Sequence, residues 1–479
     1  MHQGLKRSNF SQYSLLATLL AGAVALGACG GGSAASPLSN NTPSTGSSSP
    51  TMVTAGDAPM SSVLAALVTI SAVSVTSASG TVQLLKQPRT IELTHLGGIR
   101  APLDDALLPQ GTYTSLSLTV TAAQITYIDP TSGKPVTASA TIPAASATAT
   151  LTLNPALVVN STAATDVRFD FDLQKSLDLT GGVVTFTPVI AAAAANVSGE
   201  NDNERGIDIN GTVTATDTTK NTITLTTDDT GLSVTLNVTS ATEFGDSMTL
   251  ASLQVGTEIH AEAKLNSDGT LSALAVEAAN GGSTVDDNSR EDGGIVTAVT
   301  LDSNNVLTGF SMVVSDSVRE GSLGQVLTVQ VNSGTLFKDT LVAQNAGLAS
   351  FDATQVFPGQ GVWVAGTKSG TGTVLATEVR PAAVNPFGLT SAAVQTGTNG
   401  GFVISLLLNA NTSFAKFANL STLTVDTNAA TVFDGQTLSS TTVGSLTVGT
   451  PLVARGFLAL SGTSITEFCN HLHETGPEN

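Results

Sequence analysis

Two acidic segments contain the side chains that are best suited to bind a cation. Carboxylate and amide oxygens are the ligands that Ca2+ prefers, and a protein site supplies about six to eight of them. Neither segment has the spacing of an EF-hand loop, so we favour a solvated charged linker between folded modules over a calcium site. The candidate calcium ligands are Asp202, Glu204, Asp208 and Asn210 at the first junction, and Asp286, Asp287, Asp292 and, as a further oxygen donor, Asn288 at the second.

The end of the chain contains a second group of metal-ligand side chains. Cys469, His471 and His473 are each separated by one residue, and thiol and imidazole donors suit Zn2+ or copper. We favour a free tail there, because three donors on one short segment rarely close a metal site. Asp166, Asp170 and Asp172 alternate with apolar residues. They could bind a cation as well, but we favour the plain solvent face of a strand.

The sequence contains no recognised catalytic motif, so no catalytic residue is assigned. The patterns G-x-S-x-G, H-E-x-x-H and G-x-x-x-x-G-K-[ST] do not occur. A carboxylate pair for glycoside hydrolysis needs no local motif, so a hydrolase with carboxylate catalysis in the N-terminal domain is the alternative function. Aromatic platforms for a sugar are scarce, since the chain has one Trp, Trp363, and three Tyr.

The first 28 residues have the layout of an export signal. Lys6 and Arg7 precede an apolar stretch that is too short to span a bilayer and ends in Leu26-Gly27-Ala28-Cys29. This ending resembles a bacterial lipobox, which implies that Cys29 is acylated and becomes the mature N-terminus. The alternative is an ordinary secretory signal with a cysteine near its cleavage point. Residues 29–52 are rich in Gly, Ser and Pro and are predicted to be a flexible tether.

Charge and the lipobox limit the partners. The chain has 18 Lys and Arg against 37 Asp and Glu, a formal net charge of −19, and loss of the signal with its two basic residues lowers this to −21. Such a surface argues against nucleic acid. The partners that we expect are the membrane, through the lipid anchor, and an unknown envelope protein or polysaccharide. Gly30 stands where lipoproteins retained at an inner membrane have Asp, so the resemblance implies an outer-membrane protein that faces the periplasm or the cell surface.

The candidate ligand side chains must be positioned by β-strands. From residue 53 onward apolar and polar residues alternate with a period of two, as in residues 113–120, 166–173 and 232–238. Val and Thr are frequent in these runs, and Gly, Asn and Asp separate them. This pattern is typical of half-buried antiparallel strands. The predicted fold class is all-β.

Residues 53–196 are predicted to form a β-sandwich. Four segments in order are Gly56-Asp57-Ala58-Pro59, Leu108-Pro109-Gln110-Gly111, Phe169-Asp170-Phe171-Asp172 and Thr187-Pro188-Val189-Ile190. They resemble the family called domain of unknown function 4382, found in exported bacterial proteins. The resemblance implies a β-sandwich and brings no established activity. The strand that usually precedes the Asp-Ala-Pro turn is reduced here to Met52-Val53-Thr54.

A diverged repeat follows the sandwich. Its central turn contains Gly256, Gly359 and Gly449, at spacings of 103 and 90 residues. A Thr-x-Phe segment precedes each turn, and a Gly-led strand opens each unit. These residues are Thr242/Phe244, Thr335/Phe337 and Thr431/Phe433, with Gly211, Gly294 and Gly388 at the openings.

The repeat layout resembles domain of unknown function 5666, three times in tandem. The predicted units are residues 207–279, 294–381 and 388–468, followed by a tail over residues 469–479. Each unit is expected to be a small β-barrel, in which the turn Gly has a positive φ and the Phe plugs the core.

Taken together, these patterns predict a lipid-anchored cell-envelope protein. Its tether, sandwich and three barrels suit a non-catalytic binding, adhesion or scaffold role, with affinity from strand edges and loops. No cofactor is expected, and calcium at the two acidic junctions is the alternative to the solvated linkers that we favour.

Overall fold

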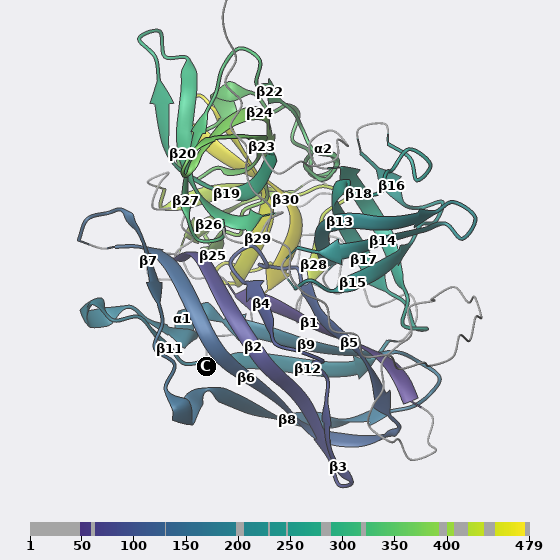
Figure 1. The fold of residues 1–479 in the computed structure, drawn as a ribbon. Coiled ribbons are helices and arrows are strands. Elements are labelled where there is room, and N and C mark those ends of the chain that lie inside the picture. Colours follow the sequence, from purple (N-terminus) through teal and green to yellow (C-terminus); the bar gives the residue numbers. More distant parts are fainter. Residues whose placement is uncertain are drawn as a thin grey trace, which may run out of the picture. The chain divides into compact units, whose positions relative to one another are not determined.

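The structure of the protein is a computed structural model in which strands make up nearly all of the regular secondary structure of the described residues (Figure 1). Two short α-helices occur there, α1 (Leu173–Ser176) and α2 (Leu341–Ala346). No helix in the described part of the chain is long and apolar enough to cross a membrane. The described residues are 48–58, 63–129, 131–197, 206–228, 230–245, 248–278, 289–317, 322–391, 400–406, 420–434 and 446–474, all within the compact unit of residues 46–479.

The N-terminal domain is a sandwich of two β-sheets, as predicted. Its strands are β1 (Ser48–Ala58), β2 (Val63–Ser77), β3 (Gly80–Gln83), β4 (Arg89–Glu92), β5 (Ala101–Pro109), β6 (Gly111–Ile128), β7 (Pro135–Ser139), β8 (Thr148–Val159), β9 (Thr165–Asp172), β10 (Leu177–Asp178), β11 (Thr185–Phe186) and β12 (Ile190–Asn196). One sheet has the order β12-β9-β1-β5, and the other has β3-β2-β6-β7 with β4 on β2 and β8 on β6. Both sheets contribute to one apolar core, in which Phe169, Phe171 and Phe186 are fully buried.

Strand β1 begins inside the segment that was predicted to be tether. It pairs antiparallel with β5 and parallel with β9, so it is an interior strand of its sheet. Ser49 is fully buried, and its hydroxyl donates a hydrogen bond to the Ala163 carbonyl at 2.6 Å. Residues 48–52 therefore belong to the sandwich, and the shortened Met52-Val53-Thr54 strand is the middle of an 11-residue one.

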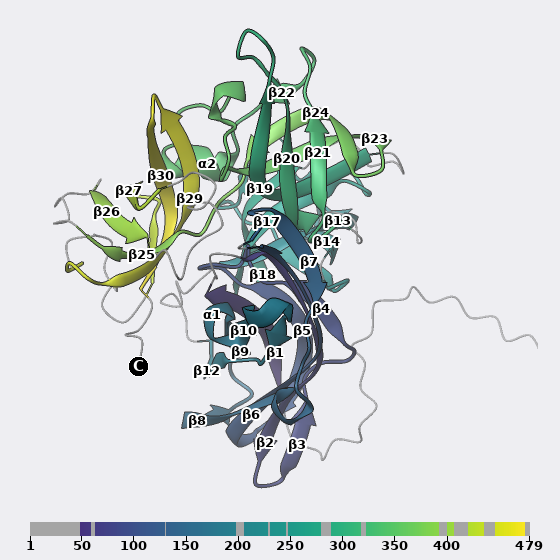
Figure 2. The same cartoon turned by 90° about the vertical axis from the view of Figure 1, so that its left-hand side faces the viewer.

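Three barrel-like modules follow, and their sheets have the same strand order. The orders are β15-β14-β13-β17-β18-β16, β21-β20-β19-β23-β24-β22 and β27-β26-β25-β29-β30-β28, each closed by one further pairing, β15–β18, β21–β24 or β27–β30. Figure 2 shows the long hairpin of β29 and β30 in the third module. Bounds in the first module are β13 (Ile207–Asp217), β14 (Thr222–Thr227), β15 (Ser233–Asn237), β16 (Glu243–Phe244), β17 (Glu258–Leu265) and β18 (Leu271–Ala278). Those in the second are β19 (Ser289–Leu301), β20 (Leu307–Ser317), β21 (Val326–Gln330), β22 (Leu336–Phe337), β23 (Gly361–Gly370) and β24 (Thr373–Pro381). Those in the third are β25 (Phe387–Thr390), β26 (Gly401–Leu406), β27 (Thr422–Asp426), β28 (Val432–Asp434), β29 (Pro451–Ser461) and β30 (Ser464–Glu474).

The glycine of the central turn has the backbone conformation that the sequence predicted. The φ angles of Gly256, Gly359 and Gly449 are +87°, +99° and +92°, a region that side chains with a Cβ rarely adopt. Each glycine N–H also donates to a carbonyl of the first strand of its module, at 2.8, 2.7 and 2.7 Å. The turn is therefore tied to the same strand in all three modules.

The Thr-x-Phe segment acts mainly through its threonine. Thr242, Thr335 and Thr431 donate from Oγ1 to a carbonyl of the last strand of the module (β18, β24 or β30), at 2.8, 2.8 and 2.7 Å. The phenylalanines are only half-buried and pack against the side of the core instead of plugging it. The reason is that β16, β22 and β28 are edge strands of two or three residues, which reach the core from one side.

The last strand extends into the predicted tail. β30 continues to Glu474, and Cys469 and Leu472 are fully buried in the core of the third module. Their burial explains why the strand goes on beyond residue 468.

Candidate functional site

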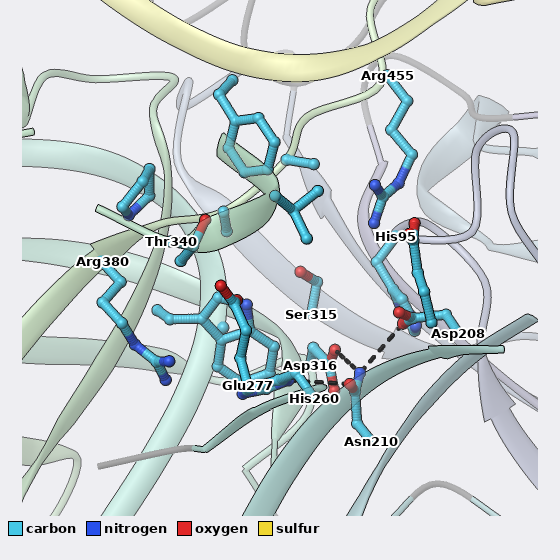
Figure 3. Close-up of a pocket in the computed structure, with 18 of the residues that line it drawn as sticks. His95, Asp208, Asn210, His260, Glu277, Ser315, Asp316, Thr340, Arg380 and Arg455 are labelled. Carbon is cyan, nitrogen blue, oxygen red and sulfur yellow. Dashed lines mark hydrogen bonds between the residues drawn. The ribbon is translucent and has the colours of Figure 1, made fainter. Parts of the chain in front are cut away.

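A cavity of about 110 Å³ is lined by polar side chains from the sandwich and from all three barrel-like modules (Figure 3). His95 lies three residues beyond β4, Asp208 and Asn210 are on β13, Asp316 is on β20 and Arg455 is on β29. Titratable groups of both signs therefore meet in one place, although they are far apart in the sequence.

The alternation of β13 explains why Asp208 and Asn210 face the cavity. Ile207 and Ile209 point into the core of the first module, so the polar residues between them point the other way. On the neighbouring strand β17, His260 is directly opposite Asn210. Because side chains alternate between the two faces of a strand, the outer face of the β13–β17 pair is polar where its inner face is apolar.

Asn210 connects the polar side chains of the site. Its Nδ2 donates to Asp208 Oδ2 at 3.1 Å and to Asp316 Oδ2 at 3.0 Å (Figure 3). Its Oδ1 is 2.9 Å from His260 Nδ1. One amide therefore holds two carboxylates and an imidazole in fixed positions.

The orientation of His95 is set by a buried carboxylate. Its Nδ1 lies 2.8 Å from Glu92 Oε2, and Glu92 is fully buried. The other oxygen of Glu92 accepts hydrogen bonds from the Ala66 N–H at 2.6 Å and the Thr94 hydroxyl at 2.9 Å. A carboxylate that is held at both oxygens fixes the ring orientation of the histidine that it contacts.

His95, Asp208 and Asp316 form a compact group of potential metal ligands. One ligand atom from each lies within 4.8 Å of the others. Burial raises the pKa of Asp316 to about 6, with the Asp208 and Glu92 charges adding to the effect and the His95 and His260 charges opposing it. Two carboxylates and an imidazole at this separation can share a proton or bind a cation.

A second network of buried charges borders the cavity. Arg380 forms ion pairs with Glu291 and, at 3.3 Å, with Glu378, and His260 Nε2 lies 3.2 Å from the same Glu291. Burial by itself would raise the pKa of Glu291, but the Arg380 charge and the contact with His260 outweigh it and lower that pKa. The His260 ring also packs on Trp363, with 4.2 Å between ring centroids.

The structure places only some of the predicted site residues at the cavity. Asp208 and Asn210 line the cavity, whereas Asp292 lies on β19, is 1% exposed, and accepts hydrogen bonds from Arg290 at 2.8 Å and Ser317 at 2.7 Å. The structure therefore does not bring Asp292 to the group around Asp208. The predicted calcium ligands Asp202, Glu204, Asp286, Asp287 and Asn288 and the predicted lipidation site Cys29 lie outside the described residues.

Sequence reasoning did not select His95 and Asp316 as site residues. Asp316 follows the apolar run Met312-Val313-Val314 on β20, and a carboxylate directly after buried residues is a signal that could have been used. His95 follows Leu93-Thr94 with no local motif. Only the folded chain places it beside Asp208.

The interpretation of residues 166–172 as a plain solvent face is wrong for Asp166. That residue is 3% exposed, and its Oδ2 accepts hydrogen bonds from Arg100 at 2.8 Å and Arg168 at 2.7 Å. Arg100 lies outside the segment, so the pattern within the strand could not reveal this partner.

The thiol near the C-terminus is part of a core. Cys469 Sγ is 3.1 Å from the His471 carbonyl oxygen, and burial raises the thiol pKa well above its ordinary value, with the Glu467 charge adding to the rise. A thiolate is the form that binds metal, so this environment disfavours Cys469 as a ligand.

Glu467 is expected to make the stability of the third module depend on pH. It is fully buried, neither carboxylate oxygen has a hydrogen-bond partner among the described residues, and burial raises its pKa well above the ordinary value. Since the folded state keeps a proton that the unfolded state loses, stability should fall as pH rises above the unfolded pKa, by up to about 1.4 kcal/mol per pH unit until the folded pKa is passed.

Urea unfolding at pH 5 and pH 7.5 tests this expectation. Glu467→Gln should reduce the difference in stability between the two pH values, whereas Glu474→Gln at the end of the same strand should leave it unchanged. Equal pH dependence in wild type and Glu467→Gln would contradict it.

The fold and the site define an all-β protein of one sandwich and three barrel-like modules with a polar cavity among them. Residues 52–188 match the family model Domain of unknown function (DUF4382), and residues 210–277 match Domain of unknown function (DUF5666). These matches support the order of the two kinds of domain. No curated protein matches the chain.

Two solved structures resemble the chain weakly. A deletion mutant of the single-stranded DNA binding protein from Thermus aquaticus is 12% identical, and the match covers 40% of this chain and 96% of that one with a TM-score of 0.17. The drosophila Unr segment CSD456 is 10% identical, with 57% and 98% covered and a TM-score of 0.13. Similarity at this level supports no conclusion about the protein.

Proposed function

We propose that the chain is a lipid-anchored cell-envelope protein with a non-catalytic binding or scaffold role. In this proposal Cys29 is the acylated N-terminus, and the tether carries the sandwich and three copies of one small barrel family. The partner would be an envelope protein or polysaccharide, and the location the outer membrane.

The observation that carries the proposal is the threefold recurrence of one module. The three sheets have the same strand order, the same Thr-to-carbonyl hydrogen bond and the same positive-φ glycine turn. Tandem copies of one unit are typical of proteins that display an extended binding surface. The repetition supports a scaffold better than an enzyme, in which one module usually holds the reacting groups.

The anchor is tested by replacing Cys29. Wild-type protein should have an intact mass that corresponds to a chain starting at acylated Cys29, and it should fractionate with membranes. Cys29→Ser should abolish acylation and release the protein from that fraction, whereas the matched control Cys469→Ala should stay membrane-bound. Wild-type protein that carries no lipid and is soluble would contradict the anchor.

The non-catalytic role is tested separately. Crosslinking in intact cells should capture an envelope partner with wild-type protein and not with the released Cys29→Ser form. The purified protein should turn over no member of a panel of glycoside and ester substrates. Turnover that one Asp→Asn substitution in the sandwich abolishes would establish the hydrolase instead.

A further inference from the structure

His95, Asp208 and Asp316 have the donor atoms and the separation of a three-residue metal site. Their potential ligand atoms, one imidazole nitrogen and two carboxylate oxygens, lie within 4.8 Å of one another. Atoms that bind one ion at about 2.0–2.2 Å must be separated by no more than about 4.4 Å, so small side-chain rotations suffice to bring all three onto an ion. The three residues also line the cavity, which leaves space beside the group.

The surroundings of His95 add an independent observation that points to a ligand. Histidines that bind metal usually place their other ring nitrogen against a carboxylate, which fixes the tautomer and the ring orientation. His95 has this arrangement, because its Nδ1 is 2.8 Å from the fully buried Glu92. Nε2 is therefore the nitrogen that can face Asp208 and Asp316.

The two carboxylates are oriented in a comparable way. Asn210 donates from one amide nitrogen to an oxygen of Asp208 and to an oxygen of Asp316. Each carboxylate has a second oxygen that can turn to an ion without breaking this bond. Asn210 is thus a positioning residue, and it holds carboxylates from two different modules at one point.

The donor set selects the class of metal. Ca2+ takes about six to eight oxygen ligands, and this group supplies two carboxylates and a nitrogen. One histidine and two carboxylates with an open position suit Zn2+ and related first-row divalent ions. The ion would also neutralise the negative charges of Asp208 and Asp316, which the fold places close together.

We propose that His95, Asp208 and Asp316 bind one Zn2+-class ion, with the remaining coordination position open to the cavity. The ligands come from the sandwich, the first module and the second module. Binding therefore fastens the sandwich and the first two barrel-like modules to one another. It leaves one coordination position for water or for an oxygen or nitrogen atom of a partner molecule. The inference stands whether or not the chain is membrane-anchored.

The first experiment uses the full-length protein in detergent after removal of metal with a chelator. Titration with Zn2+ and Co2+ should give one ion per chain, and the Zn2+ complex should melt at a higher temperature than the metal-free protein. X-ray absorption of the Zn2+ complex should show one imidazole and otherwise oxygen ligands. Ca2+ should neither compete with Zn2+ nor raise the melting temperature.

Variants assign the ligands. His95→Gln and Asp316→Asn should each weaken Zn2+ binding at least about 100-fold, and Glu92→Gln about 10–100-fold, as is typical for residues that support a ligand. His473→Gln is the matched control, because it removes a histidine from the C-terminal group and should leave the affinity unchanged. Circular dichroism of the metal-free variants checks that they fold.

Three results would overturn the proposal. The first is wild-type protein that binds no Zn2+ or Co2+. The second is an unchanged affinity in folded His95→Gln or Asp316→Asn. The third is a sulfur ligand in the absorption spectrum, or loss of binding in His473→Gln, since either would place the ion at the C-terminal group. Because the X-ray absorption spectrum is recorded on the wild-type Zn2+ complex, it tests the proposal even if a variant fails to fold.

Discussion

Replacing Arg380 with methionine is expected to lower the free energy of unfolding by about 3–5 kcal/mol. The side chain is 3% exposed and pairs with two buried carboxylates, Glu291 and Glu378. Glu378 keeps a second partner, Lys338 at 2.6 Å, whereas among the described residues Glu291 would keep only its contact with His260. The cost comes mainly from leaving Glu291 charged in a buried place, because breaking a buried pair costs more than its net contribution to stability.

A double-mutant cycle measured by urea unfolding tests this reason. Adding Glu291→Gln to Arg380→Met should restore more than half of the lost stability, since it removes the stranded charge. The matched control is Lys220→Met, whose partner Asp217 is exposed, and it should cause no measurable change. If the changes in unfolding free energy of Arg380→Met and Glu291→Gln simply add in the double variant, the two side chains are not coupled, and a stranded Glu291 charge does not explain the cost.

The cost of Arg380→Met should also depend on pH in a defined direction. The pKa of Glu291 is lowered in the folded state, so the stability that its charge contributes is present above its unfolded pKa and is lost as pH falls through the folded pKa. The variant should therefore differ less from wild type at acidic pH than at pH 7.5.

Replacing Gly294 with alanine is expected to destabilise the second module by about 3 kcal/mol or more. A Cβ at this position would overlap the carbonyl oxygen of Val313 on the paired strand and lie 2.8 Å from its carbonyl carbon. Both are backbone atoms, so no side-chain rotation can relieve the overlap. The strands β19 and β20 would have to separate where they meet.

The matched control for Gly294→Ala is Gly370→Ala. Gly370 is also on a strand of the second module, but the nearest atoms to its added Cβ are 3.8 Å away. Calorimetry of the full chain should show a large drop in the melting temperature of one unfolding transition for Gly294→Ala and almost none for Gly370→Ala. Similar melting curves for both variants would contradict the close approach of the two strands.

The same close approach occurs at the corresponding glycines in the first strands of the other two modules. A Cβ on Gly211 would overlap the Thr226 carbonyl oxygen, and a Cβ on Gly388 would lie 2.6 Å from the Ser405 carbonyl oxygen. The sequence predicted that these three glycines open corresponding strands. The strands do correspond, but they begin earlier, at Ile207, Ser289 and Phe387, and the sequence did not show why these positions are glycine. The reason is contact with a strand that follows later in the chain, which local patterns do not report.

Much of the fold could be predicted from the sequence because strands have a period of two. The alternation in residues 166–173 and 232–238 predicted strands that the structure contains as β9 and β15, and turn glycines such as Gly256 predicted a positive φ. These features depend on neighbouring residues and on backbone sterics alone. The ends of elements were less accurate, since β1 and β30 extend into the predicted tether and tail through contacts with distant strands.

The candidate site could be predicted only in part. Asp208 and Asn210 were selected because acidic and amide residues cluster before Gly211 in the sequence. Their actual neighbours, His95 and Asp316, are more than 100 residues away on either side. A ligand set assembled from the sandwich and two modules has no fixed spacing in the sequence. The predicted calcium ligands and the observed ligand group therefore share only Asp208, and Asn210 lies beside the group as a positioning residue.

For this protein the sequence by itself determined the fold class and the glycine turns, because these follow from side-chain period and from local steric limits, while the resemblance to two families implied the order of the domains. The tertiary structure alone decided which charges are buried and paired, as with Asp166, Glu291 and Arg380, and which side chains meet at the cavity. The physical reason is that burial and electrostatic interaction depend on distance in space, and strand pairing between distant segments sets that distance.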